Sequence, residues 1–279
     1  MKLITFDRNR IGAVHESGVF DLTRRLQFTD MRQALVATDA VLTAITGQQP
    51  DFQIDDVVLD LPINNPTRIY CIGVNYMNRN EEYKDGSDAP KYPSVFVRNP
   101  RSFVAHGKAL DIPPESDQLD YEGEIVLVIG TAGRRISQAD AMEHVAGLTV
   151  MNEGTIRDWV RHGKFNVTPG KNWDKSGGIG PWIETDMSGL DVTDMRVETR
   201  VNGELRQSDT TASMAFPFAR IIEYLSTFGT LETGDLIATG TPTGAGARFD
   251  PPVWLTPGDV VEVTVKGVGT LTNTVRLEP

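Results

Sequence analysis

The sequence predicts a strand-rich α+β fold with a small N-terminal domain, on the basis of three observations. Apolar segments of strand length, separated by turn residues, dominate the 279-residue chain. The few segments with helical character do not alternate regularly with these strands, which disfavours a doubly wound parallel sheet. Residues 60–66 contain two prolines and two asparagines, a composition typical of a linker. We therefore divide the chain into an N-terminal α+β domain, residues 1–65, and a main domain, residues 66–279.

The N-terminal domain is expected to combine short strands with one helix. Asp30 is suited to cap a helix over residues 31–45, because its carboxylate can accept hydrogen bonds from the free amides of the first turn. Gly47 can end this helix, since glycine adopts the left-handed conformation common after a last turn. The strands are expected over residues 3–6, 11–14 and 19–22.

The main domain is expected to consist mainly of strands. Residues 125–129 form an unbroken apolar run, which is typical of a strand covered on both faces. Near the C-terminus, residues 267–269 separate two strand-like segments and predict a hairpin. The other strands are expected over residues 68–74, 94–98, 235–238, 259–265 and 270–275. Helices are expected over residues 138–143, 155–160 and 217–226.

Composition narrows the classes of function and location. A net charge of −11 and a pI near 4.9 argue against nucleic acid or an anionic membrane as a partner. Cys71 is the only cysteine, which excludes an intrachain disulfide and suits a reducing compartment. The first residues lack the apolar core of a signal peptide, and no apolar stretch approaches the roughly 20 residues needed to cross a bilayer. We expect a cytoplasmic protein.

Two glutamates, Glu122 and Glu124, stand directly before the apolar run at residues 125–129. Alternate residues of a strand point to the same face, so both carboxylates should project together, about 7 Å apart at their roots. Two neighbouring anions at the start of a buried strand repel each other and lose hydration. A divalent cation would relieve both costs, whereas a solvated strand end would need none.

A third acid, Glu153, follows another apolar segment where a helix is expected to begin. Near a helix N-terminus, the partial positive charge of the backbone can stabilise this carboxylate without a metal. Alternatively, Glu122, Glu124 and Glu153 can bind Mg²⁺ or Mn²⁺ together, with water or substrate oxygens completing the coordination. Both interpretations are open from the residues alone.

Further motifs follow these acids in a defined order along the chain. Together they resemble the fumarylacetoacetate hydrolase family, in the branch of acylpyruvate hydrolases and 2-hydroxyhepta-2,4-diene-1,7-dioate isomerases. The resemblance spans residues 66–279, and the joint order and spacing are far more specific than any single motif. The matching residues are Gly73–Tyr76, Asp120–Glu124, Asn152-Glu153 with Arg157-Asp158, Lys171 with Asp174, Gly180–Trp182, Val201–Glu204, Gly234-Asp235, Thr239–Pro242 and Gly258-Asp259.

The resemblance implies a fold with a rolled, mixed β-structure at its centre, commonly assembled as a homodimer. It implies a divalent metal on two glutamates and an aspartate, which correspond to Glu122, Glu124 and the position of Glu153. Its substrates are small 2-oxo or 2,4-dioxo acids that chelate the metal. A hard Lewis acid would stabilise the enolate that forms when a neighbouring C–C or C–H bond breaks.

The resemblance also implies roles for residues around the metal. Lys171 matches a family lysine placed near the substrate oxyanion, although most lysines are simply solvated. Thr241 lies in a turn whose hydroxyl and amide groups can bind the substrate carboxylate, or which is an ordinary turn. Tyr76 is a candidate to line the substrate pocket, although aromatic residues in such places more often fill the core.

This chain departs from the family pattern at two places. Glu153 stands where the family has an aspartate, so the third ligand is one methylene longer. In the lid segment, members that hydrolyse carry a histidine and a glutamate, and here the positions hold Arg79 and Glu82. Arginine is permanently charged and has no acceptor atom, so Arg79 cannot serve as a general base. Glu82 is then the candidate base, unless His106 or His162 supplies an imidazole, and Arg79 is a candidate ligand for a distal substrate carboxylate.

The expected function is that of a Mg²⁺- or Mn²⁺-dependent enzyme acting on a 2-oxo or 2,4-dioxo acid, for example in the breakdown of aromatic compounds. Hydrolysis of a C–C bond, decarboxylation and keto–enol isomerisation are all compatible with the motifs, and Arg79 favours the two reactions that need no water. The alternatives are a catalytically impaired relative, which binds metal and oxo acids without turnover, and a protein whose carboxylates are merely solvated.

Overall fold

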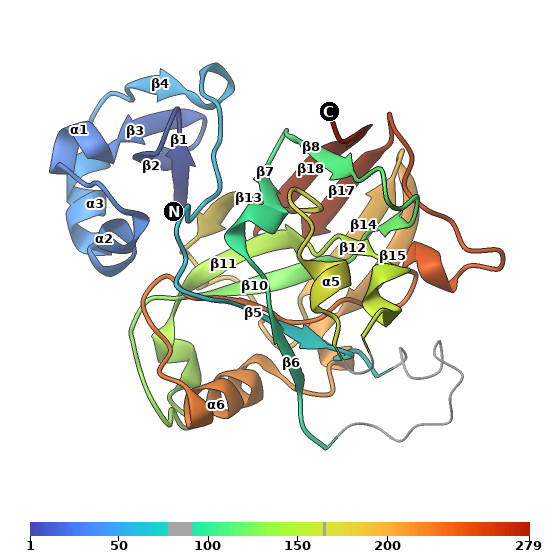
Figure 1. The fold of residues 1–279 in the computed structure, drawn as a ribbon. Helices are drawn as coiled ribbons and strands as arrows, with labels where there is room; N and C mark the ends of the chain where they lie inside the picture. Colours follow the sequence, from blue (N-terminus) through green and yellow to red (C-terminus); the bar gives the residue numbers. More distant parts are fainter. Residues whose placement is uncertain (78–90, 164–165) are drawn as a thin grey trace.

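A large mixed sheet of eleven strands forms the centre of the computed structural model, which describes residues 1–77, 91–163 and 166–279 (Figure 1). Its strand order is β4-β3-β2-β1-β13-β11-β10-β16-β5-β6, with β7 paired to β13 beside this path. Neighbours are antiparallel except for the parallel pairs β16–β5 and β13–β7. The predicted strand-rich α+β fold is confirmed. Its strands are β1 (Lys2–Phe6), β2 (Arg10–His15), β3 (Gly18–Asp21), β4 (Phe52–Gln53), β5 (Ile69–Gly73), β6 (Ser94–Val97), β7 (Phe103–Ala105), β10 (Gly123–Ile129), β11 (Val145–Asn152), β13 (Gly177–Glu184) and β16 (Leu236–Ala238).

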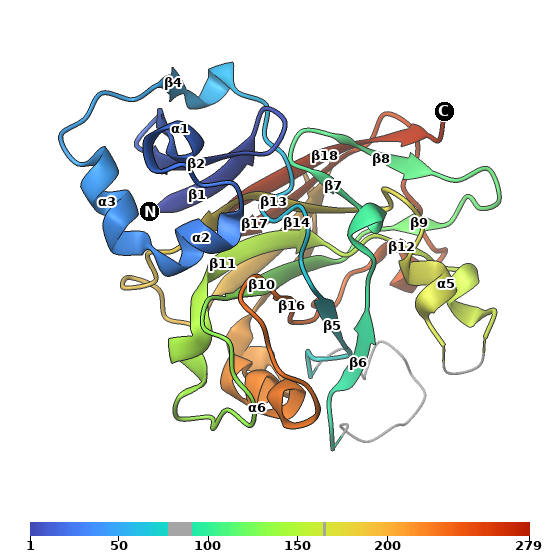
Figure 2. The same cartoon turned by 60° about the vertical axis from the view of Figure 1, so that its left-hand side comes forward.

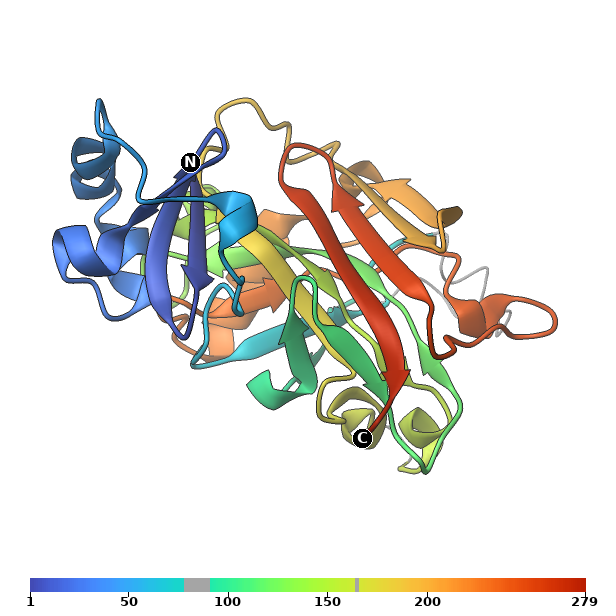
Figure 3. The ribbon, with the colours of Figure 1, turned by 90° about the horizontal axis from the view of Figure 1, so that it is seen from above.

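A second sheet of five strands packs against the first. Its order is β15-β14-β17-β18-β8, and β17 and β18 form the hairpin that was predicted around Gly267. Figure 3 shows this hairpin, in red, stacked on the strands of the large sheet. A short two-stranded pair, β9 with β12, lies beside the site described below. The strands are β8 (Ala109–Ile112), β9 (Leu119–Asp120), β12 (Thr155–Ile156), β14 (Arg196–Val201), β15 (Glu204–Thr210), β17 (Val260–Val265) and β18 (Gly269–Leu277).

Strand β10 is covered on both faces, as its unbroken apolar run predicted. Ile125, Leu127 and Ile129 belong to the core cluster between the two sheets and α6 (Phe218–Phe228). Val126 and Val128 point the other way, into a cluster that includes the N-terminal strands and helices. The site lies at the start of this strand. Because the strand is buried on both faces, the site is held in a rigid part of the molecule.

The helix predicted over residues 31–45 is divided into α2 (Met31–Val36) and α3 (Thr38–Ile45). Asp30 caps α2 as predicted, since its carboxylate accepts a hydrogen bond from an amide of the first turn. Ala37 interrupts the helix with φ −119° and ψ 39°. The residues on either side of it are β-branched and lose side-chain freedom in a helix, which favours a break at this point. A further short helix, α1 (Leu22–Leu26), follows β3 directly.

Of the three helices expected in the main domain, one forms as predicted. It is α6, which buries Phe218, Ile221, Ile222 and Leu225 along one face. The helix expected over residues 138–143 is a single 3₁₀ turn at Ala141–His144. The helix expected over residues 155–160 is wrong, because Thr155 pairs with Asp120 in the β12–β9 ladder and only a 3₁₀ turn follows at Trp159–Arg161. Here pairing to a distant strand overrides the local preference.

The N-terminal strands extend the large sheet through the pairing of β1 with β13 (Figure 2). The predicted linker packs against β1, where the Thr5 hydroxyl donates a hydrogen bond of 2.9 Å to the carbonyl of Pro62. The division of the chain at residue 65 stays a prediction. Within the described ranges, none of the helices is both long and apolar enough to cross a membrane.

Candidate active site

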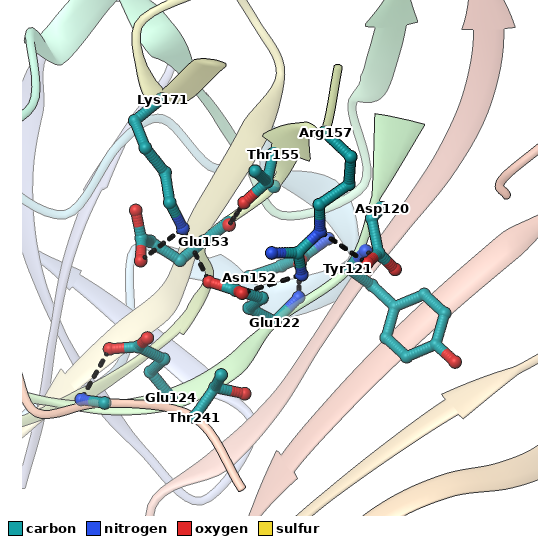
Figure 4. Close-up of polar contacts among 12 residues, drawn as sticks. Asp120, Tyr121, Glu122, Glu124, Asn152, Glu153, Thr155, Arg157, Lys171 and Thr241 are labelled. Carbon is teal, nitrogen blue, oxygen red and sulfur yellow. Dashed lines mark hydrogen bonds and ion pairs between the residues drawn. The ribbon is translucent and has the colours of Figure 1, made fainter. Parts of the chain in front are cut away.

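The three predicted acids lie together where β10 begins and β11 ends (Figure 4). The antiparallel register pairs Gly123 with Asn152, and this brings Glu153 next to Glu122. The backbone amide of Glu153 donates to the carbonyl of Glu122 at 2.7 Å, and the Asn152 side chain accepts from the Glu122 amide at 2.9 Å. One carboxylate oxygen from each of Glu122, Glu124 and Glu153 lies within 4.8 Å of the others, and all three residues are buried.

Lys171 lies between two of these acids. It ends the short helix α5 (Thr168–Lys171), and its Nζ donates to Glu122 Oε2 at 2.6 Å and to Glu153 Oε2 at 2.9 Å. Burial by itself lowers the pKa of Lys171, but the charges of Glu122 and Glu153 outweigh it and raise the pKa. The lysine is therefore a fixed, buried ammonium ion and not the solvated lysine that composition alone would suggest.

Arg157 and Asp120 complete the site, although neither was predicted to have a role there. Arg157 donates from Nη2 to Glu122 Oε1 and from Nε to Asp120 Oδ2, both at 2.7 Å. Its Nη1 has no partner among the described residues, so a donor is left for a ligand. Asp120 is fully buried and also accepts from the amides of Gly246 and Ala247. The pairing of Thr155 with Asp120, which brings Arg157 here, could not be read from local sequence.

Glu124 differs from the other acids because no cation within the described ranges pairs with it. Among the described residues, its Oε2 accepts from the amide of Gly240, at 2.8 Å. Burial, then the charges of Glu153 and Glu122, raise the pKa of Glu124 well above its ordinary value. Arg98 donates to Glu153 Oε1, the oxygen that Lys171 does not contact. In the described part of the chain, three cations thus face four carboxylates, which leaves an excess negative charge at Glu124. The cations are Arg98, Arg157 and Lys171, and the carboxylates are Asp120, Glu122, Glu124 and Glu153.

This donor set fits Mg²⁺ or Mn²⁺. Three buried carboxylates supply hard oxygen ligands, and the excess negative charge would be offset by a divalent ion. With metal–oxygen distances of about 2.1 Å, neighbouring ligand oxygens in an octahedron lie about 3 Å apart. The side chains need to move only slightly inward from their separations of 4.8 Å or less. Glu153 is as well placed as the other two, although it is longer than the family aspartate.

The acids form one end of a pocket with a volume of about 410 Å³. Lys171, Arg157 and Thr241 add polar groups to its lining, and Val74, Phe96 and other apolar side chains form its walls. A larger, more open depression of about 790 Å³ lies beside it and contains none of the three glutamates. We therefore place the site in the smaller pocket, because the three glutamates and Lys171 line it.

The turn at residues 239–241 lies against this pocket. Thr241 is almost fully buried, and its Oγ1 accepts a hydrogen bond of 2.9 Å from Gln207. Gly240 has a φ of +101°, and a Cβ atom there would lie 2.7 Å from the Cβ of Asn75. Only glycine fits this position, and it lets the backbone amide reach Glu124.

Other predicted residues lie outside the pocket lining. Tyr76 is buried in the core, its hydroxyl has no hydrogen-bond partner in the described ranges, and it is not among the lining residues. His106 accepts from the amide of Thr272, and His162 packs on a tryptophan ring, so neither contributes an imidazole to the pocket. Arg79 and Glu82 lie outside the described residues. The roles of Tyr76, Arg79 and Glu82 stay predictions.

Comparison with known proteins agrees with this arrangement. The model of the fumarylacetoacetate (FAA) hydrolase C-terminal family matches residues 68–276. The chain belongs to the fumarylacetoacetate hydrolase family. The predicted resemblance is confirmed, and the protein is an enzyme of this family. The N-terminal residues lie outside the matched region.

The chain is similar to several named proteins and solved structures. Oxaloacetate tautomerase YisK of Bacillus subtilis is 43% identical over 225 residues, which are 80% of this chain and 74% of YisK. The human mitochondrial oxaloacetate tautomerase FAHD2B is 35% identical over 267 residues, 95% of this chain and 84% of its own length. A probable 2-hydroxyhepta-2,4-diene-1,7-dioate isomerase from Mycobacterium abscessus has a crystal structure with a TM-score of 0.83, at 33% identity over 100% of this chain and 98% of that one.

Proposed function

We propose that this protein is a divalent-metal-dependent tautomerase that interconverts the keto and enol forms of a small 2-oxo acid such as oxaloacetate. The buried cluster of Glu122, Glu124 and Glu153 at one end of a 410 Å³ pocket carries this proposal. A pocket of this size accommodates a small acid of a few carbon atoms. The relatives named as oxaloacetate tautomerases support the choice of substrate class.

The chain's own groups have distinct tasks in this site. Glu122, Glu124 and Glu153 would hold Mg²⁺ or Mn²⁺, which when bound supplies Lewis-acid stabilisation of negative charge on the 2-oxo oxygen. The ammonium group of Lys171 lines the same pocket and can donate a hydrogen bond to that oxygen as its charge develops. Arg157 Nη1 and the Thr241 hydroxyl are the proposed donors to the substrate carboxylate.

Keto–enol interconversion suits a pocket without an activated water molecule. The reaction breaks the C–H bond next to the carbonyl and forms an O–H bond at the 2-oxo oxygen, so it moves a proton and consumes no water. All four histidines of the chain lie within the described ranges, and none of them lines the pocket. A histidine that activates water is thus lacking, which favours proton transfer over C–C hydrolysis. We propose Glu82 as the base.

Oxaloacetate supplied with Mg²⁺ or Mn²⁺ is expected to equilibrate between its keto and enol forms faster with the enzyme than without it. The test follows the enol absorbance, with separate assays for CO₂ and for pyruvate in the same reaction. Treatment with EDTA should remove the activity, and added Mg²⁺ or Mn²⁺ should restore it, because the carboxylates need a divalent ion. Release of CO₂ as the main product would replace tautomerisation by decarboxylation, and full activity in EDTA would exclude the metal site.

Metal affinity is expected to rise as the pH rises above the range in which ordinary carboxylates titrate. Burial, then neighbouring charges, raise the pKa of Glu124, so the metal-free cluster holds a proton more tightly than an ordinary carboxylate does. That proton must leave when an ion binds, and acidification therefore weakens binding while a higher pH strengthens it. Calorimetry in two buffers of different ionisation enthalpy should show proton release when the ion binds, and the number of protons released should fall as the pH rises. An affinity that is constant from about pH 5 to about pH 8 would contradict this.

Homodimeric assembly and a place in the breakdown of aromatic compounds stay predictions. The first is tested by light scattering of the purified protein. The second is tested by assaying 2,4-dioxo acids such as acylpyruvates beside oxaloacetate. A clear preference for the longer acids, with release of a free acid, would favour the hydrolytic branch of the family instead.

A further inference from the structure

Arg98 lies next to Glu153 of the acid cluster and is not among the residues that line the pocket. It follows the last residue of β6, and its side chain is fully buried. Its Nη1 lies 3.4 Å from Glu153 Oε1 and donates to the carbonyl of Gly154 at 2.9 Å. Its Nε donates to Ser102 Oγ at 3.1 Å, and its Nη2 donates to Ser176 Oγ at 2.9 Å. A buried guanidinium held on three sides has almost no freedom to reorient.

Arg98 and Lys171 each contact a different oxygen of Glu153. Oε1 faces Arg98, whereas Oε2 accepts from Lys171 at 2.9 Å. Because each oxygen has its own cationic partner, the plane of the carboxylate is fixed. A glutamate has one more rotatable bond than an aspartate, so it loses more conformational entropy when it is held as a ligand. Arg98 supplies the restraint that this longer ligand requires.

The backbone after Glu153 is held by the same group of residues. Gly154 packs so closely on Ser176 that a Cβ atom would lie 1.8 Å from the Ser176 carbonyl oxygen. Arg98 bonds both to the Gly154 carbonyl and to the Ser176 hydroxyl. It therefore ties β13, which follows Ser176, to the end of β11, which carries Glu153.

We propose that Arg98 is a positioning residue that sets the orientation of Glu153 toward the metal. Arg98 does not line the pocket, so it acts on the reaction only through Glu153. The inference rests on the proposed function, because it requires Glu153 to be a metal ligand. Groups that orient metal ligands from behind typically contribute 10- to 100-fold to metal affinity.

The test measures the affinity of the purified protein for Mg²⁺ and for Mn²⁺ by calorimetry in Arg98→Met and Arg98→Lys. Arg98→Met should weaken binding of Mg²⁺ by about 10- to 100-fold. The loss should be smaller for Mn²⁺, because Mg²⁺ demands near-ideal octahedral geometry. Arg98→Lys keeps a donor and should recover part of the affinity. The control is Arg276→Met. It also removes an arginine from a buried carboxylate, but that carboxylate is Asp111 on β8 of the second sheet and not one of the three acids.

Ser176→Ala provides a second variant in case Arg98→Met does not fold. It removes the nearer of the two acceptors of Arg98 Nη2 without changing any of the acids, and roughly threefold weaker Mg²⁺ binding is expected from one lost hydrogen bond. Unchanged or tighter Mg²⁺ binding in folded Arg98→Met would overturn the proposal, as would unchanged binding in Ser176→Ala if only that variant folds. A wild-type protein that binds neither ion would instead overturn the proposed metal site.

Discussion

Replacing Glu124 by glutamine is expected to lower the rate of oxaloacetate tautomerisation by about 10³-fold and to weaken Mg²⁺ binding by more than about 100-fold. Glu124 is the acid that no cation pairs with in the described part of the chain, so its charge is the part of the site that a divalent ion neutralises. Glutamine has the same shape, and its carbonyl can still accept from Gly240. The rate is measured from the enol absorbance and the affinity by calorimetry.

The same substitution is expected to stabilise the metal-free protein. The pKa of Glu124 is raised in the folded state, so the folded protein binds this proton more tightly than the unfolded chain does. Stability therefore falls as the pH rises through the interval between the unfolded and the folded pKa, and glutamine removes that loss. In EDTA at about pH 8, Glu124→Gln should melt at a higher temperature than wild type. An activity loss accompanied by a lower melting temperature would instead indicate a structural defect.

Glu184→Gln is the matched control for this experiment. Glu184 is also a buried carboxylate on a strand of the large sheet, but it pairs with the N-terminal ammonium group at 2.8 Å. Its loss should lower stability and leave metal affinity and turnover within about twofold of wild type. If Glu184→Gln lost activity as severely as Glu124→Gln, the effect would not be specific to the acid cluster.

Strand periodicity was sufficient to predict the first half of the site. Glu122 and Glu124 were expected to point the same way because they are two residues apart at the start of an apolar run, and their carboxylates do lie together. The third acid could not be placed by spacing, since the β10–β11 register brings Glu153 to them. Only the resemblance to the family linked these residues in advance.

The positions of the cations around the acids could not be predicted from the local sequence. Lys171 was predicted to lie near the substrate only because it matches the family motif, and the structure places it at the end of α5. Arg98 stands more than 50 residues before its partner Glu153, and nothing in its neighbourhood marks it as a buried ion. Burial of an arginine depends on which acids the fold brings near it, and that information is spread over several strands.

Errors in the helices have the same origin. Residues 155–160 were expected to be helical, yet the β12–β9 pairing takes the first of them into a ladder. That pairing sets Arg157 against Asp120 and Glu122. Residues 155–160, for which local helix preference gave the wrong prediction, thus supply a residue of the site. Such disagreement is expected where a functional site overrides local propensity.

Lys171→Met is expected to lower turnover by roughly 10²- to 10³-fold while metal binding is kept or becomes tighter. The ammonium group is the donor proposed for the developing oxyanion, so its removal should act on the chemical step. It also removes one positive charge from beside Glu122 and Glu153, which leaves the cluster more negative and more attractive to a divalent ion. A site lysine with a purely structural role would not separate the two measurements in this way.

The stability of Lys171→Met should depend on whether the metal is present. Without an ion, Glu122 and Glu153 lose a buried partner, which costs on the order of 3 kcal/mol. Saturating Mn²⁺ should restore much of that loss, because the ion takes over the compensation of both carboxylates. Lys175→Met is the control: it removes a half-exposed lysine, 3.4 Å from Asp111, and should change neither turnover nor the response to Mn²⁺. If Lys171→Met turned over oxaloacetate at the wild-type rate, the oxyanion role would pass from Lys171 to Arg157 or to the metal alone.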